Sequence, residues 1–281
     1  MEWSVRDQFA CDGFTIVRGL LDRSEVAFYV ARLRDLGGMA ERWTEPDGVS
    51  RHSEFWPLIF NVRLLAAVRA IFGPSVRYLP HTDLHVGFSS FSWHRDSVTR
   101  RFGDGADWDE TAAPYRIARV GIYFQSYDDS QFRLGLVTGS HRTGGLDAKQ
   151  QRRIERRTSA PANVLSRLSG LDFLGSHAEW VAPDRGDCVI FDPRILHTGS
   201  RFQGEKYSIF LAYGVENAHF HRHWHYYLRL RTDLGYSRVP PALAERLQAA
   251  GLLAQEPPAD LAIDRAWMPS PAFVSVARRF K

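Results

Sequence analysis

The chain has 281 residues, of which 44% are hydrophobic, so it can bury a sizeable core and lies near the upper size of a single domain. Its formal charge of +4 is a mild basic excess that would suit a small anionic or polar molecule. Nucleic-acid-binding proteins show clustered positive charge, which this excess does not reach, so we expect no nucleic-acid partner. Residues 1–281 are therefore predicted to form one domain.

Cysteine usage and the N-terminus bear on the compartment. The two cysteines are Cys11 and Cys188, and Cys188 lies in an apolar run, which favours a buried reduced thiol over a disulfide. The first residues lack a basic region followed by an apolar one, and no run approaches the roughly eighteen apolar residues of a membrane span. We expect a cytoplasmic protein in a reducing compartment, with no membrane partner.

The N-terminal part, residues 1–75, is predicted to be mainly helical from its apolar periodicity and its capping residues. The expected elements are a helix over 4–11 ended by Asp12-Gly13, a strand over 14–17, a helix over 25–36 capped by Asp22 or Ser24, an irregular polar loop over 39–53, and helical periodicity over 55–72 with a cap at Asn61.

The pattern then changes to alternating and continuous apolar runs, which predict a β core over about 76–214. The expected strands cover 76–78, 84–94, 117–127, 132–137, 180–181, 188–191 and 206–213. A turn over 184–187 separates two of these strands and predicts a hairpin that delivers His197 just beyond its second strand. Strands with turn signals and flanking helices favour a mainly β fold, the double-stranded β-helix or jelly-roll barrel of cupin-like metalloenzymes.

One short stretch carries the metal hypothesis. His94 and Asp96 in Trp93-His94-Arg95-Asp96 are two residues apart, so on an extended strand end both side chains point to the same side. His197, about a hundred residues later, can supply a third ligand. Two imidazoles and one carboxylate on one face of an octahedral ion leave the opposite face open, the arrangement of non-haem Fe(II) oxygenases.

Three other segments have a simpler interpretation that we prefer. The charged run 149–157 could contact a phosphate, but it is typical of a solvated helix or loop. The histidine-rich extension after Gly214 could hold a second metal through histidines 219, 221, 223 and 225, but packing of its aromatic side chains over the barrel mouth is the preferred reading. The turn Thr138 to His141 is interpreted as structural, so His141 is not counted as a ligand. A helix is expected over 239–253 within the extension 215–281.

Five motifs follow one another in the chain: the opening Asp12-Gly13-Phe14, Trp93-His94-Arg95-Asp96, Thr138-Gly139-Ser140-His141, Gly186-Asp187 with Phe191, and the distal His197. Together they resemble the phytanoyl-CoA dioxygenase family of Fe(II)- and 2-oxoglutarate-dependent oxygenases. The resemblance extends over most of the chain. It implies an oxygenase that uses Fe(II), 2-oxoglutarate and O2, with His94, Asp96 and His197 as the iron ligands.

One position departs from the family pattern. The family places an arginine on the strand after the distal histidine to hold the far carboxylate of 2-oxoglutarate, but this chain has Lys206 and Ser208 there. A lysine pairs with a carboxylate as a point charge and cannot grip it through two parallel hydrogen bonds. Lysine is scarce in this chain, so Lys206 is the first candidate anchor, with Ser208 on the same strand face and with Arg201 or Arg119 as alternatives.

The predicted function is oxidation of a small molecule, presumed to be hydroxylation in a biosynthetic or catabolic pathway, with conversion of 2-oxoglutarate to succinate and CO2. The candidate pocket residues are Trp108, Tyr123, Gln125, Arg119 and the aromatic cluster around Trp224, and for each of them ordinary packing is the preferred interpretation. Two alternatives remain. One is a cupin-like isomerase or hydrolase that uses the same three ligands without O2, and the other is a non-catalytic ligand-binding barrel.

Overall fold

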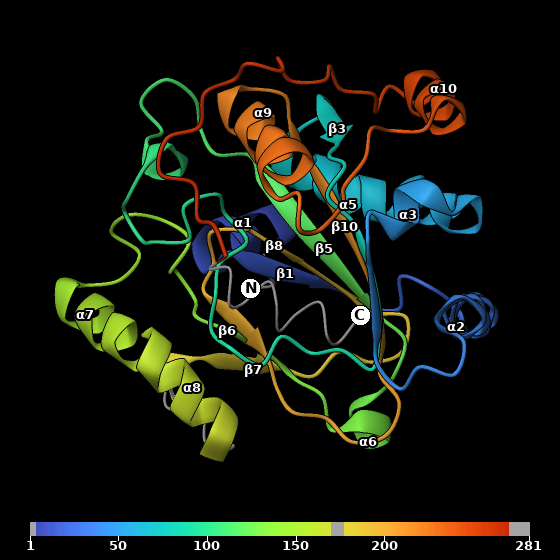
Figure 1. Cartoon of the computed structure of the whole chain (residues 1–281), viewed down its shortest axis with the longest axis horizontal. Helices are drawn as coiled ribbons and strands as arrows, with labels where there is room; N and C mark the ends of the chain where they lie inside the picture. Colours follow the sequence, from blue (N-terminus) through green and yellow to red (C-terminus); the bar gives the residue numbers. More distant parts are fainter. Residues whose placement is uncertain (1–3, 170–176, 270–281) are drawn as a thin grey trace.

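The computed structural model describes residues 4–169 and 177–269 (Figure 1). Its helices are α1 (Val5–Asp12), α2 (Arg23–Gly37), α3 (Gly48–Arg51), α4 (Trp56–Ile59), α5 (Val62–Phe72), α6 (Tyr127–Ser130), α7 (Ala148–Arg157), α8 (Ala160–Ser169), α9 (Ala218–His225) and α10 (Pro241–Ala249). Short single-turn segments occupy Ser53–Phe55, Ala106–Trp108 and Tyr226–Leu230. Figure 1 shows α7 and α8 together on one side of the molecule, opposite α2 and α3.

The strands form two antiparallel sheets. They are β1 (Phe14–Val17), β2 (Trp43–Pro46), β3 (Val76–Tyr78), β4 (Asp83–Val86), β5 (Ile117–Tyr123), β6 (Leu134–Leu136), β7 (Glu179–Val181), β8 (Cys188–Phe191), β9 (His197–Gly199) and β10 (Tyr207–Val215). The large sheet has the order β1-β8-β5-β10-β4-β2 with β3 also paired to β10, and the small sheet has the order β7-β6-β9. The chain is therefore mixed α/β with a large antiparallel sheet, rather than mainly β. Between the described residues no ladder joins the two sheets, so closure into a barrel stays a prediction.

Strand β10 lies at the centre of the large sheet, where Ile209 is opposite Ile122 of β5 and Leu84 of β4 (Figure 1). Because alternate side chains of a strand point to opposite faces, this register defines an outer and an inner face of the sheet. Ile209 and its apolar partners form the outer face. Ser208, opposite Tyr123, belongs to the inner face.

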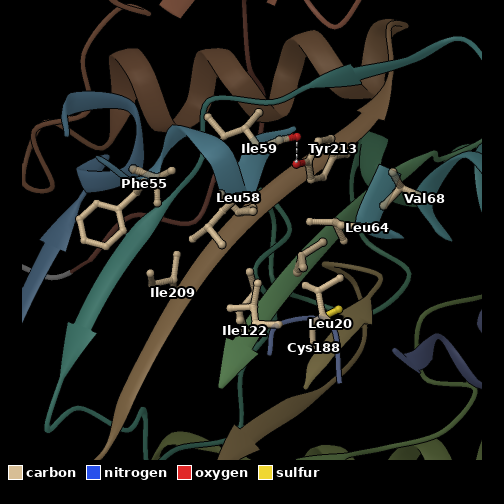
Figure 2. Packing of buried hydrophobic residues seen from close by; sticks show 14 of the residues in the cluster. Leu20, Phe55, Leu58, Ile59, Leu64, Val68, Ile122, Cys188, Ile209 and Tyr213 are labelled. Atoms are coloured by element: carbon tan, nitrogen blue, oxygen red, sulfur yellow. Dashed lines mark hydrogen bonds between the residues drawn. The ribbon is translucent and has the colours of Figure 1, made fainter. Parts of the chain in front are cut away.

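The outer face is covered by the N-terminal helices and by α10. Its buried cluster joins strand residues such as Ile122, Ile209 and Tyr213 to helix residues such as Leu58 and Leu64 (Figure 2). The Tyr213 hydroxyl donates a hydrogen bond to the Ile59 carbonyl at 2.8 Å, so the one polar group of this strand residue is satisfied within the core. The helices therefore pack on the outer face of β10, and its inner face points into the space between the two sheets.

The inner face packs against the small sheet. Leu134 and Leu136 of β6 share a buried cluster with Phe14, Val189 and Phe191 of the large sheet. The two sheets therefore face each other across an apolar layer, and their inward side chains meet in a water-poor interior.

Most of the predicted elements are confirmed, with boundaries shifted by at most four residues, as at β5, which ends at Tyr123 instead of 127. The cap of α2 is Asp22, which forms a capping box with Glu25, and Asn61 caps α5 as predicted. The charged run is the helix α7. The helix α10 is shorter than the predicted 239–253.

Three predictions of secondary structure are wrong. Residues 43–51 form β2 and α3 instead of a loop, because β2 pairs with β4 at the sheet edge. The side chains of β2 lack a strand pattern, so the sequence did not predict this strand. Strand structure does not continue from 87 to 93, and only an isolated bridge forms at His94. The strands at 179–181 and 188–191 do not form a hairpin, because β7 pairs with β6 whereas β8 pairs with β1 and β5 in the other sheet.

The Gly186-Asp187 motif is explained by backbone packing between these two strands. Gly186 has φ +81°, and a Cβ there would lie 2.4 Å from the Leu21 carbonyl oxygen, so only glycine fits without a shift. The Asp187 carboxylate accepts hydrogen bonds from the Gly19 amide at 2.7 Å and from Arg18 at 2.6 Å. This motif therefore fixes the N-terminal segment to the end of β8.

Cys11 and Cys188 are both free thiols, as predicted, and Cys188 is buried. Among the described helices, none by itself is long and apolar enough to cross a bilayer. The helical segments Ser53–Ile59 and Val62–Phe72, with a 46° bend between them, pass that test of length and composition only when taken together.

Candidate metal centre

The three predicted ligands come together in the structure. His94, Asp96 and His197 each offer one ligand atom, and these atoms lie within 4.8 Å of one another. His94 Nε2 is 3.6 Å from Asp96 Oδ1, and His197 Nε2 is 3.7 Å from Asp96 Oδ2. Within 4–169 and 177–269, this is the one group of three or more such side chains arranged to hold a metal ion. The donor set is that of a two-histidine, one-carboxylate site.

Backbone pairing brings the ligands together. His94 and His197 form an isolated antiparallel bridge, with each amide donating to the other carbonyl at 3.0 Å. The Asp96 amide donates to the Pro193 carbonyl at 2.8 Å, so the following residues stay beside the same segment. His197 opens β9 of the small sheet. The long-range pairing of two short segments therefore builds the site.

The same backbone fixes the histidine tautomers. His94 Nδ1 lies 2.7 Å from the Ser92 carbonyl oxygen, and His197 Nδ1 lies 3.0 Å from the Ile195 carbonyl oxygen. A carbonyl oxygen only accepts, so both Nδ1 atoms carry the proton and both Nε2 atoms present a lone pair. The imidazoles are therefore oriented as metal ligands through Nε2.

Electrostatics give the ligands the protonation states that a metal requires. Burial lowers the pKa of His94 to about 3 and lowers the pKa of His197 below its ordinary value. Burial by itself would raise the pKa of Asp96, but His197, His94 and Arg119 outweigh it and hold the pKa well below the usual range. At neutral pH the site offers two neutral imidazoles and one carboxylate.

Arg119, one of the predicted alternative anchors, lies beside the candidate metal ligands and already has partners. Its side chain is buried and pairs with the Asp83 carboxylate at 2.7 Å, and it also donates to the His81 carbonyl. Its Nε lies 3.7 Å from Asp96 Oδ2. This guanidinium therefore supports the charge and orientation of Asp96, and its Nη donors are already engaged.

Lys206 lies elsewhere on the inner face and has no acidic partner among the described residues. It is 3% exposed, its Nζ donates to the Ser208 hydroxyl at 3.1 Å, and it lies 4.4 Å from the centre of the Phe132 ring. Burial lowers the pKa of Lys206 to about 7. A buried ammonium without a counter-charge is costly, so this position favours an anionic ligand.

Arg201, the other predicted alternative, is exposed on the surface. Its guanidinium lies 5.2 Å from the centre of the Phe91 ring. It is therefore not part of the buried inner face that holds Lys206 and Ser208.

His85 on β4 is an interior residue that the sequence interpretation missed. It lies opposite Ser208 in the sheet, and its ring centre is 5.1 Å from that of Phe210. Burial lowers its pKa, the charges of Lys206 and Arg119 lower it further, and Asp96 raises it. The signal was present in the alternation of β4, because His85 must face opposite to the core residue Leu84.

The histidine-rich segment is a helix that packs beside the metal centre. His223 Nε2 of α9 lies 2.9 Å from His81 Nδ1, and His81 stacks on Tyr227 at 3.5 Å between ring centres. The Tyr227 hydroxyl donates to the Asp96 backbone carbonyl at 3.1 Å. In the described part of the chain, no second group of three such side chains lies close enough together to hold a metal ion.

The remaining candidate residues mainly serve packing. Trp108 packs on Phe102 at 4.6 Å between ring centres, and the Gln125 side-chain oxygen accepts a hydrogen bond from the Tyr207 amide. Tyr123 stacks on Phe132 beside Lys206.

The turn at Thr138 to His141 also has the predicted structural role. The Ser140 hydroxyl accepts a hydrogen bond from the Leu196 amide at 2.9 Å, next to His197. His141 packs closely against Gly13, because a Cβ atom at position 13 would lie 2.4 Å from the Nδ1 atom of His141.

Comparisons with known proteins give a fold and no family. No protein-family model matches the chain, and no curated protein matches it. The resemblance to the phytanoyl-CoA dioxygenase family therefore stays a prediction.

Several solved structures share the fold of this chain. HygX from Streptomyces hygroscopicus, with nickel and 2-oxoglutarate bound, is similar over 73% of this chain and 84% of its own, with 19% identity and a TM-score of 0.52. SnoK, a non-haem α-ketoglutarate-dependent carbocyclase from nogalamycin biosynthesis, is similar over 75% and 82%, with 16% identity and a TM-score of 0.52. The non-haem monooxygenase ThoJ is similar over 75% and 77%, with 19% identity and a TM-score of 0.52.

Proposed function

We propose that the protein is an Fe(II)- and 2-oxoglutarate-dependent oxygenase that hydroxylates or otherwise oxidises a small molecule and converts 2-oxoglutarate to succinate and CO2. The observation that carries the proposal is the cluster of His94, Asp96 and His197, with the protonation states of metal ligands, in a chain with the fold of such enzymes. A cytoplasmic location and one domain over residues 1–281 belong to the same proposal.

Each residue of the centre has a defined task in this proposal. His94, Asp96 and His197 would hold the iron, which would supply the coupling of O2 reduction to decarboxylation. Arg119 keeps Asp96 ionised and oriented through its charge. The Phe191 ring, 4.9 Å from that of His197, excludes water from one side of the ligand.

Lys206 is the proposed anchor for the far carboxylate of 2-oxoglutarate. The carboxylate would supply the counter-charge that the ammonium lacks, and the Ser208 hydroxyl, 3.1 Å from Nζ, would hold the ammonium in place. The ammonium must be protonated to bind an anion, and the Lys206 pKa of the free protein is about 7. Binding of 2-oxoglutarate should therefore weaken as the pH rises above about 7.

Anaerobic titration with Fe(II) and then 2-oxoglutarate tests the function. We expect one iron per chain and a weak visible charge-transfer band when 2-oxoglutarate chelates it. Under air, the same protein should release succinate. Iron binding without this band, and without succinate, would contradict the co-substrate assignment.

Replacing Lys206 by alanine tests the anchor. Lys206→Ala should raise the 2-oxoglutarate concentration for half-saturation by about ten- to a hundredfold, because a charge-assisted contact is lost, and should leave iron binding nearly intact. Lys149→Ala, at an exposed position of α7, is the matched control and should behave as wild type. An unchanged requirement in Lys206→Ala would contradict the assignment of Lys206 as the anchor.

A cupin-like metalloenzyme, an isomerase or hydrolase that works without O2, is the second candidate. The observation that favours it is the lysine at the place where the resembling family has an arginine. Metal-dependent turnover of a substrate in the absence of O2 and 2-oxoglutarate would support it, and succinate release under air would exclude it.

The solved structures with a similar fold suggest a substrate class. The nogalamycin enzyme and the hygromycin B complex of HygX concern small natural products, and HygX in that complex is 21% identical to this chain. We infer a free small molecule from biosynthesis or catabolism as the substrate, with no nucleic-acid or membrane partner.

A further inference from the structure

The loop that follows Asp96 is held firmly in place. The buried Asp107 carboxylate accepts hydrogen bonds from the Val98 amide at 2.7 Å and from the Thr99 amide at 3.3 Å. From the C-terminal part of the chain, the Trp267 amide donates to the Val98 carbonyl at 2.8 Å. Arg100 follows Thr99 directly, so these hydrogen bonds fix the backbone on its N-terminal side.

Arg100 has an unusual backbone and, among the described residues, no ion-pair partner. Its φ is +59°, in the left-handed region that is strained for a non-glycine residue. Its guanidinium lies 3.7 Å from the centre of the Trp267 ring, and its buried Nε has no hydrogen-bond partner. In the described part of the chain, no carboxylate lies within ion-pair distance of it.

Arg231 gives a comparison on the same tryptophan. It lies 5.2 Å from the Trp267 ring, but its guanidinium is paired with Asp233 at 2.8 Å. Stacking on Trp267 therefore does not require an unpaired cation. Arg231 therefore combines the contact to Trp267 with a carboxylate, whereas Arg100 has the ring contact and no carboxylate among the described residues.

A chain of contacts joins Arg100 to the metal centre. The carbonyl of Trp267, on whose ring Arg100 stacks, accepts a hydrogen bond from the Tyr226 hydroxyl at 2.6 Å. The Tyr226 ring is 4.9 Å from that of Tyr227, and the Tyr227 hydroxyl donates to the Asp96 carbonyl at 3.1 Å. Together with the position of Arg100 four residues after Asp96, these contacts place the guanidinium on the side of the loop that borders the centre.

Three of the cations described above thus differ in their partners. Arg119 is neutralised by Asp83 and lies beside Asp96, and Lys206 is assigned to 2-oxoglutarate. Arg100 remains, with a planar fork of donors that suits an oxyanion and a tryptophan face that fixes its plane.

We propose that Arg100, stacked on Trp267, binds an oxyanion of the primary substrate, a carboxylate or a phosphate, and so positions an acidic small molecule at the metal centre. The inference rests on the proposed function and names its substrate class. Arg100 is on this view a specificity-determining residue, and neutral analogues of the substrate should bind poorly.

Binding of simple oxyanions to the loaded enzyme tests the proposal. Benzoate, phenyl phosphate and neutral benzamide are titrated calorimetrically into anaerobic protein saturated with Fe(II) and 2-oxoglutarate, so that Lys206 is already occupied. We expect benzoate or phenyl phosphate to bind at least about tenfold more tightly than benzamide, and the stronger of the two identifies the oxyanion.

Two variants remove the cation in different ways. Arg100→Gln keeps a polar side chain, and Arg100→Gly suits the left-handed backbone and should fold at least as well as wild type. Both should weaken oxyanion binding by about ten- to a hundredfold and leave benzamide binding and the 2-oxoglutarate band unchanged. Arg101→Gln is the matched control at an exposed neighbouring position and should bind as wild type.

The outcomes separate this inference from the proposed function. Equal binding of benzamide and the oxyanions, no oxyanion binding to wild type, or full oxyanion binding by both variants would overturn it while the 2-oxoglutarate band stands. Loss of the band in both variants would also overturn it, because Arg100 would then serve the co-substrate. If wild type shows no band, the proposed function fails. The titrations with benzoate, phenyl phosphate and benzamide are then repeated in metal-free Lys206→Ala protein, with and without Arg100→Gln. Without Lys206 to bind the anions, they test oxyanion binding by Arg100 independently.

Discussion

The two faces of the large sheet use the same strands for different purposes. On β10, Leu211 and Tyr213 point outward into an apolar core behind the helices, whereas Ser208 and Phe210 point inward with Lys206. The outer face buries apolar side chains, and the Tyr213 hydroxyl there is hydrogen-bonded, whereas the inner face holds an ammonium with no acidic partner among the described residues. The proposed function therefore separates stability and binding on alternate residues, so substitutions on the two faces should have different consequences.

The largest effect is expected at the inner ligands. His94→Ala should weaken Fe(II) binding more than about a hundredfold, since loss of a residue that only supports a ligand already costs ten- to a hundredfold. Succinate formation should fall below detection, while the midpoint of urea unfolding of the metal-free protein changes little. His221→Ala, on the more exposed side of α9, is the control. Normal iron binding by His94→Ala would contradict the proposal that iron binds at the inner face through His94.

On the outer face, Leu211→Ala should act on stability. Its side chain is fully buried, so truncation should lower the free energy of unfolding by about 2–5 kcal/mol. Val62→Ala, at a position that is 79% exposed, should change it by less than about 0.5 kcal/mol. Iron stoichiometry of the folded Leu211→Ala protein should stay at one. A large loss of iron affinity in the folded variant would break the proposed separation of the two faces.

A smaller effect on stability concerns the cation of the inner face and depends on pH. The Lys206 pKa is lowered from 10.5 to about 7 in the folded protein, so between these values the unfolded chain binds more protons. The contribution of Lys206 to stability therefore improves as the pH rises from 7 to 10. Metal-free Lys206→Met should be more stable than wild type at pH 7, with an advantage that shrinks towards pH 10.

Urea unfolding at several pH values measures this difference, with exposed Lys149→Met as the control that should show no such trend. A constant difference between wild type and Lys206→Met would mean that the buried ammonium carries no penalty in the free protein.

Much of the candidate site could be predicted from local sequence. The two-residue spacing of His94 and Asp96 requires only an extended backbone to bring both side chains to one side, and the structure has this arrangement. Capping residues and apolar periodicity likewise placed α2 and α5 correctly. These features depend on neighbours along the chain, so the sequence carries them directly.

Other features depend on partners far away in the chain. The hairpin prediction for 180–191 is wrong because two strands with a turn between them can pair with other strands, and β7 and β8 join different sheets. The β2 strand exists because β4 offers an edge to it. His85 reached the interior through the register of β4 with β10.

The sequence by itself determined the ligand types, the order of the motifs and the unusual Lys206. Tertiary structure decided which cations keep a free charge, because that depends on carboxylates brought from distant positions. Arg119 meets Asp83 and Asp96, whereas Lys206 and Arg100 meet aromatic rings and no described carboxylate. The difference between a structural and a binding cation is thus a property of packing, since an ion pair forms only where the fold places both partners.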